Sequence, residues 1–199
     1  MRLPADQRRL QLLEVARARF AEQGFHATSM DEIAEAAGVT KPVLYQHFPS
    51  KRALYVELLE GTGQALLRTL ADSAGRASSG RAAVEGGFRA YFQFALTNRD
   101  GFRLLLASAV RSDDEFSRVV SEMMDAITLA IAGLIDIPDE THRMVLASAI
   151  VGMAESVSRH TLWGQAADTD PDTLARWISE LAWFGLRGVR VDASGAGAL

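Results

Sequence analysis

The side chains best suited to chemistry lie within one short stretch of the chain. Lys41, Tyr45, Gln46 and His47 place a cation, a phenol, an amide and an imidazole on a single predicted helix. Groups of these kinds hydrogen-bond to phosphate oxygens and to the edges of bases. A helix that carries polar, aromatic and basic residues near its N-terminal end is suited to enter the major groove of DNA. The stretch therefore predicts a nucleic-acid contact surface.

Signals on either side of this stretch predict a helix-turn-helix. Ser29 followed by Glu32 forms a capping box for a first short helix, and Gly38 supplies the left-handed position that ends it. Thr40 is expected to cap the second helix, whose first turn tolerates Pro42. The apolar residues expected to face inward are Ile33, Ala34, Ala37, Val43, Leu44 and Phe48.

Composition excludes several classes of protein. The chain has 199 residues, 48% of them apolar and 23% charged, which is ordinary for one or two globular domains. It has no apolar run of about 18 residues, no secretory signal and no cysteine, so we expect a cytoplasmic protein without a membrane span. The four histidines lack the spacing of metal ligands, and we expect neither a metal nor a cofactor.

Charge is unevenly divided along the chain. The first 55 residues carry eight basic and six acidic side chains, whereas the remainder carries 13 basic and 19 acidic ones. Both lysines of the protein, Lys41 and Lys51, fall in the helix-turn-helix region, although an arginine-rich composition would also explain their scarcity elsewhere. We call residues 1–55 the head and the remainder the body. A mildly basic head followed by an acidic body is compatible with DNA binding despite the overall pI of about 5.6.

Helical periodicity continues through the rest of the chain, without strand-like alternation. A first helix is expected over about residues 6 to 23, ended by Gly24. Further helices are expected over about 51–71, around Phe88–Leu96, over Phe102–Val110, from Ser112 to Leu134, over 138–163 and over 171–190. Ser112 with Glu115 is expected to form a second capping box. The sequence predicts an all-α fold of about nine helices, with a loose tail from Asp192.

The head also matches a known pattern. It contains the run IAEAAGV, aromatic residues at Tyr45 and Phe48, and Pro49-Ser50-Lys51 ahead of Ala-Leu. In order, spacing and three-helix context this segment resembles the DNA-binding head of the tetracycline-repressor (TetR) family. The likeness covers roughly the first 55 residues. Beyond them the chain is similar only in its layout of further helices.

The resemblance implies two domains with different functions. Residues 1–50 would form the helix-turn-helix domain, and residues 51–199 a helical ligand-binding and dimerisation domain that begins with the connecting helix. It further implies a homodimer that binds a palindromic operator and is released when a small, mostly apolar ligand reorients its heads. The protein would then be a repressor, although some members of the family activate transcription.

Ten residues of the head are candidate DNA contacts. They are Thr28, Ser29, Thr40, Lys41, Pro42, Val43, Tyr45, Gln46, His47 and Lys51. Tyr45 and His47 match phosphate-contacting positions of the family. Gln46 can pair with adenine, and Lys41 can reach a base edge or a phosphate. Lys51 adds its charge to the positive end of a helix dipole.

Each of these assignments has a plainer alternative. Lys41, for which a contact is favoured, and Gln46 could instead be solvated surface residues, and capping alone explains Ser29. Pro42 and Val43 would contact thymine methyl groups, unless Val43 belongs to the core.

The predicted ligand site draws on apolar residues of the later helices. Its members are Phe88, Phe92, Phe102, Arg103, Leu105, Met123, Met124 and Ile127. Adjacent methionines would give a deformable wall, and Arg103 would hold an anionic head group or lie at the surface. The alternative is that these residues form an ordinary helical core.

The last two helices are expected to form a four-helix dimer interface. Small residues permit close approach of helices, and tryptophan is enriched at interfaces. The residues concerned are Ala147, Ala149, Gly152, Ala154, Trp163, Trp177, Trp183 and Phe184.

Two other function classes stay open at this stage. One is an architectural or division-coupled DNA-binding protein of the same fold without a small-molecule inducer. The other is an enzyme, against which the chain shows no nucleophile–base pair, phosphate loop or metal spacing. Ser156 and His160 are one helical turn apart but have no orienting acid. We expect the protein not to be an enzyme.

Overall fold

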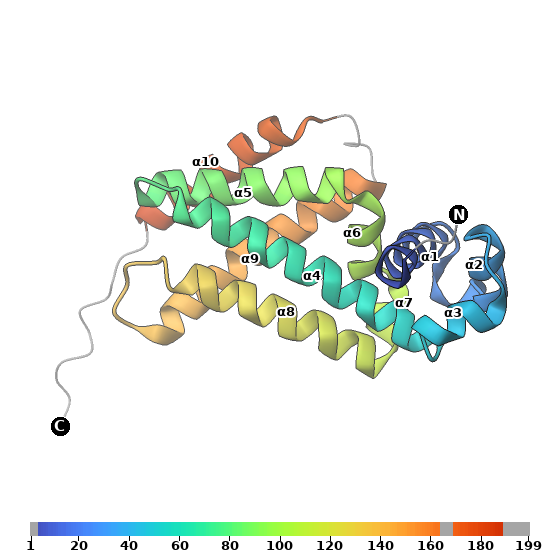
Figure 1. Ribbon diagram of the computed structural model, residues 1–199. Coiled ribbons are helices and arrows are strands. Elements are labelled where there is room, and N and C mark those ends of the chain that lie inside the picture. Colours follow the sequence, from blue (N-terminus) through green and yellow to red (C-terminus); the bar gives the residue numbers. More distant parts are fainter. Residues whose placement is uncertain (1–3, 164–168, 189–199) are drawn as a thin grey trace, which may run out of the picture. The chain divides into compact units, whose positions relative to one another are not determined.

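The computed structural model describes residues 4–163 and 169–188, which form ten helices and no strand (Figure 1). The helices are α1 (Ala5–Ala27), α2 (Met30–Ala36), α3 (Lys41–His47), α4 (Lys51–Gly75), α5 (Gly80–Thr97), α6 (Arg99–Leu105), α7 (Ser108–Ser112), α8 (Asp114–Ala132), α9 (Glu140–Trp163) and α10 (Pro171–Gly188). The predicted all-α fold is confirmed. The expected tail from Asp192 lies outside the described residues.

Ten helices replace the expected nine because one predicted helix is divided. The short helix expected over Phe102–Val110 is broken at Ala107, whose backbone is extended, so that α6 and α7 lie on either side of it.

The second predicted capping box is also wrong in detail. Asp113, not Ser112, accepts the amide hydrogens of Glu115 and Phe116 at the start of α8, and the Ser112 hydroxyl bonds back to Ala109.

The described chain divides into two compact units. The first contains residues 1–67 and 97–124, and the second contains residues 68–96 and 125–199. The chain passes between the units three times, within α4, at the last residue of α5 and within α8. These units are defined by internal contacts, and the functional division at residue 50 stays a prediction.

An aromatic cluster forms the centre of the first unit. The Phe20 and Tyr55 rings meet edge-on with centroids 5.1 Å apart, and Phe116 lies 4.7 Å from Tyr55 and 4.8 Å from Phe25. Gly24 has a positive φ of 82° as predicted, but it kinks α1 and does not end it, since the helix resumes and reaches Ala27, with Phe25 in the cluster. Burial raises the pKa of the Tyr55 phenol to about 12. The cluster joins α1, α4 and α8.

Two glycines allow helices of the first unit to approach closely. A Cβ atom on Gly101 of α6 would lie 2.9 Å from the Thr62 hydroxyl of α4. The side chain of Met123 on α8 occupies the space that a Cβ on Gly63 would need. Helix α4 is therefore in close contact with both α6 and α8 within this unit.

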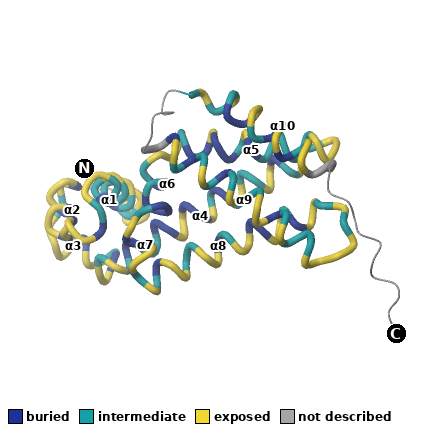
Figure 2. The backbone as a smooth tube through the Cα atoms, turned by 180° about the vertical axis from the view of Figure 1, so that it is seen from behind, coloured by how far each residue is buried: buried dark blue, intermediate teal, exposed yellow. Residues whose placement is uncertain are grey.

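The second unit is built from α5, α9 and α10 with the later parts of α4 and α8. The rings of Phe88 and Phe92 stack on α5 at 6.1 Å, and both are buried. Arg89 of α5 forms an ion pair of 3.1 Å with Asp172 in the first turn of α10. Exposed positions of α9 and α10, yellow in Figure 2, include large apolar side chains on α10.

Candidate DNA-binding site

The first helix of the motif begins with the predicted capping box. The Ser29 hydroxyl accepts the Glu32 amide at 3.2 Å, and the Glu32 carboxylate accepts the Ser29 amide at 2.7 Å. Donation from the Ser29 amide holds the pKa of the Glu32 carboxyl below its usual value. Gly38 has a φ of 65°, so the predicted left-handed turn between α2 and α3 is also confirmed.

The second helix, α3, is anchored through its inner side. Leu44 is completely buried and Phe48, which follows the helix, is 1% exposed, as expected for core residues. Thr40 occupies the N-cap position, but its side chain makes no capping hydrogen bond. The prediction that its hydroxyl caps α3 is therefore wrong, and this exposed hydroxyl stays available at the start of the helix.

The outer side of α3 presents most of the predicted DNA contacts. Tyr45 is 42% exposed, and Val43 and His47 are half-buried. The other exposed members of the set are Ser29, Thr40, Lys41, Pro42 and Gln46. Seven consecutive residues thus supply a cation, a phenol, an amide and an imidazole on a short, fixed helix.

Lys41 already has an acidic partner. Its ammonium lies 2.8 Å from one carboxylate oxygen of Asp31 on α2 and 3.1 Å from the other. This hydrogen bond raises the pKa of Lys41, which is fully charged at neutral pH. Both side chains are more than half exposed, so a phosphate can compete with Asp31 for the ammonium.

Thr28 and Lys51 are placed differently from the prediction. Thr28 is 1% exposed and its hydroxyl donates to the Gly24 carbonyl at 2.8 Å. The Lys51 ammonium donates at 2.8 Å to the carbonyls of Phe25 and Thr28, and it lies 4.5 Å from the centre of the Phe25 ring. Both side chains are used within the head. We therefore assign them structural roles, in which Lys51 fixes the end of α1 to the start of α4.

Replacing Lys51 by methionine is expected to lower the free energy of unfolding by about 1–3 kcal/mol, because buried carbonyls lose a charged donor. Chemical denaturation measures the loss. Lys41→Met is the matched control, since it removes an exposed ammonium and should leave stability almost unchanged. Equal stability of the Lys51 variant and the wild type would contradict the structural role.

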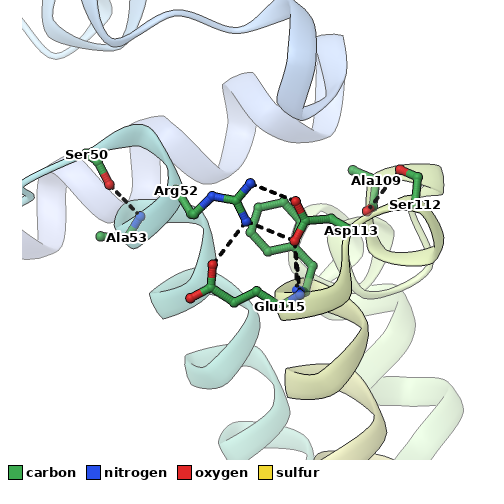
Figure 3. Close-up of polar contacts among 8 residues, drawn as sticks. Ser50, Arg52, Ala53, Ala109, Ser112, Asp113 and Glu115 are labelled. Carbon is green, nitrogen blue, oxygen red and sulfur yellow. Dashed lines mark hydrogen bonds and ion pairs between the residues drawn. The ribbon is translucent and has the colours of Figure 1, made fainter.

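Two arginines near the motif were not singled out by sequence reasoning. Arg9 of α1 forms a bidentate pair with Glu57 of α4, and its guanidinium lies 4.6 Å from the centre of the Phe48 ring. Arg52 of α4 pairs with acids at the start of α8 (Figure 3). Their partners lie 48 to 63 residues away, so no local pattern marks them.

This arrangement agrees with comparisons to known proteins. A family model described as bacterial regulatory proteins of the tetR family matches residues 12–58, and a tetracyclin repressor-like C-terminal domain matches residues 80–185. The chain belongs to the TetR family. The family assignment from the head therefore extends to the helical body, where sequence reasoning found no motif.

Three relatives show how far the similarity reaches. The transcriptional activator FasR of Mycolicibacterium smegmatis is 37% identical over 97% of this chain and 89% of its own length. The transcriptional repressor KstR2 of Mycobacterium tuberculosis is 29% identical over 93% of this chain and 82% of its own. A TetR-like regulator from Rhodococcus sp. RHA1 has a solved structure with a TM-score of 0.80 and 28% identity, covering 94% of this chain and all of that one. This TetR-family protein is a transcriptional regulator and not an enzyme.

The predicted ligand residues fall in both compact units. Phe102, Arg103, Leu105, Met123 and Met124 belong to the first, whereas Phe88, Phe92 and Ile127 belong to the second. All are buried except Met124 and Arg103, which are half-buried. Burial is expected both of a ligand cavity and of a helical core, so their role stays a prediction.

A pocket of about 180 Å³ lies elsewhere, between α5 and α10 of the second unit. It is lined by Arg81, Glu85, Arg176, Ser179, Glu180 and Trp183. None of the predicted ligand residues lines it.

Among the described helices, none combines the length and the apolar character needed to cross a membrane.

Proposed function

We propose that this TetR-family protein is a ligand-responsive regulator that binds a palindromic operator as a homodimer and is released by a small, mostly apolar molecule. The observation that carries the proposal is the outer side of α3, where polar and basic residues stand on a helix anchored by Leu44 and Phe48. A helix fixed in this way can present its N-terminal residues to base edges in the major groove. The contact set is Ser29, Thr40, Lys41, Pro42, Val43, Tyr45, Gln46 and His47.

Lys41 is proposed to exchange its Asp31 partner for an operator phosphate or base edge. Lys41→Ala is then expected to weaken binding and, for a phosphate contact, to reduce the salt dependence of the affinity by about one unit per site. Fluorescence anisotropy over a range of salt concentrations measures both quantities. Asp31→Asn removes the competing carboxylate and should leave the salt dependence intact. Unchanged affinity and slope in Lys41→Ala would contradict the contact.

A second copy of the chain is the proposed occupant of the exposed faces of α9 and α10. On α10, Trp177, Leu181 and Phe184 are each more than half exposed and recur at helical spacing. On α9, which packs against α10, the exposed face carries Val145 and the small residues Ser148, Ala149 and Gly152. An exposed apolar surface beside small residues favours close association of helices.

Two of the small residues predicted for this interface do not belong to it. Ala147 is completely buried and Ala154 is 6% exposed, so both face the interior of the second unit. Trp183 is half-buried, with its ring beside Gly80 at the start of α5. The side chain of Trp163 and residues 189–190 lie outside the described part of the chain. The interface that we propose is therefore narrower than the sequence suggested.

Release of DNA by a small molecule distinguishes this proposal from an architectural role. We expect some members of a panel of apolar acids, alcohols and esters to lower the affinity for a selected duplex and to raise the melting temperature of the free protein. The architectural alternative predicts that no molecule does either.

The direction of regulation is proposed to be repression, as named for the KstR2 relative. The FasR relative is named an activator, so the same fold serves both directions. A reporter gene placed behind the selected operator should lose expression when the protein is present. A gain in expression would assign this protein to the activators.

A further inference from the structure

Arg52 connects the start of α4 to the start of α8 within the first unit through three hydrogen bonds. Its guanidinium donates to both carboxylate oxygens of Asp113, at 2.7 and 2.9 Å, and to Glu115 at 3.0 Å (Figure 3). The same guanidinium lies 4.9 Å from the centre of the Phe116 ring. One cation thus holds two acids and covers one aromatic ring. We call these four residues the Arg52 clamp.

Asp113 belongs to the clamp and to the end of a helix at once. Its Oδ1 accepts the amides of Glu115 and Phe116, which caps α8, while both of its oxygens accept hydrogen bonds from Arg52. The hydrogen bonds from Arg52 hold the pKa of Asp113 below its usual value. The first turn of α8 is therefore attached to Arg52 through its own capping residue.

The other end of the clamp lies next to the DNA-binding helix. Arg52 is in the first turn of α4, which the Ser50 hydroxyl caps by accepting the Ala53 amide at 3.0 Å. Only residues 48–50 separate α4 from α3, and the first of them, Phe48, is fixed in the core. Because this connection is short and its first residue is buried, a displacement of the first turn of α4 is expected to displace α3 as well.

We propose that Arg52 is a positioning residue that couples the first turn of α8 to the recognition helix α3, so that operator binding and the state of α8 depend on each other. This inference rests on the proposed function of α3. Helix α8 begins in the first compact unit and ends in the second. Coupling between two sites is reciprocal, so DNA bound at α3 must also alter α8.

Hydrogen exchange at α8 tests the coupling without any knowledge of the ligand. The probe is the DNA duplex that the wild-type protein selects from a random pool. Saturating wild-type protein with this duplex is expected to slow exchange of amides in residues 114–120, which do not belong to the proposed contact set. In Arg52→Met, at DNA concentrations that again saturate the protein, the same amides should exchange at one rate with and without DNA.

Two further variants separate coupling from simple damage to the fold. Asp113→Asn keeps a side chain that caps helices well but removes the charge that binds Arg52, and it should lose the response as Arg52→Met does. Arg89→Met is the matched control, because Arg89 also pairs with two acids, Glu85 and Asp172, but in the second unit. It should respond to DNA like the wild type.

Three outcomes overturn the proposal. They are a wild-type α8 that does not respond to bound duplex, a full response in Arg52→Met, and a lost response in Arg89→Met. A wild-type protein that selects no duplex refutes the proposed function itself, whereas a protein that binds its duplex without a response at α8 refutes the clamp alone.

Discussion

Substituting glutamate for both Leu181 and Phe184 is expected to convert the proposed dimer into monomers and to weaken operator binding by roughly 10²- to 10⁴-fold. Both side chains are more than 60% exposed on α10, so glutamate at these positions should leave the fold of one chain intact. In a dimer they would be buried against a second copy, where two extra charges per chain oppose association. The loss of affinity follows because a monomer can bind only one half of a palindromic site.

Light scattering and DNA titration together check this prediction. The wild type should scatter as twice the chain mass of 21.6 kDa, and the double variant as a single chain. Leu129→Glu is the matched control, since Leu129 is 64% exposed but lies on α8, outside the proposed interface. It should remain dimeric and bind DNA normally. A double variant that stays dimeric would remove α10 from the interface.

Replacing Phe20 by alanine is expected to lower the free energy of unfolding by about 3–5 kcal/mol. Phe20 is 1% exposed and meets the rings of both Phe25 and Tyr55, so its loss leaves a cavity where α1 packs against α4. Such a loss is a large part of the roughly 5–15 kcal/mol that stabilises a typical domain.

Urea denaturation measures the effect, and Leu10→Ala supplies the control on the same helix. Leu10 is 66% exposed, so its truncation removes little buried surface and should change stability by well under 1 kcal/mol. If the two variants were equally stable, the aromatic cluster would not be the core of the first unit.

The features that sequence reasoning obtained correctly are those set by neighbours in the chain. The Ser29–Glu32 capping box, the left-handed Gly24 and Gly38 and the start of α10 at Pro171 each depend on residues within one helical turn. Helical periodicity also identified the buried side of α3, because Leu44 and Phe48 are spaced by one turn. Local patterns were therefore sufficient for the helix-turn-helix and for the fold class.

Sequence patterns missed the contacts of Lys51 and Arg52, whose partners are distant in sequence, whereas the two wrong helix caps, at Thr40 and Ser112, are local. A lysine at the start of a helix favours a phosphate contact by dipole and charge, but the Lys51 ammonium binds carbonyls 23 to 26 residues earlier. No local sequence pattern marked Arg52 as a functional residue, because its partner Asp113 lies 61 residues away. Ser112 lost its predicted capping role because α7 extends to that residue and leaves Asp113 in the N-cap position. These outcomes depend on how helices pack, which periodicity does not specify.

Selection of bound DNA from a random pool tests the central claim most directly, namely that two copies of the chain read DNA through α3. We expect the enriched sequences to contain two half-sites related by two-fold symmetry, with centres one helical turn of DNA or a multiple of it apart. Gln46→Ala should relax the base preference at one position of each half-site, whereas the Arg89→Met variant should select the same sequences as the wild type. A pool without enrichment, or with half-sites that lack symmetry, would contradict the account.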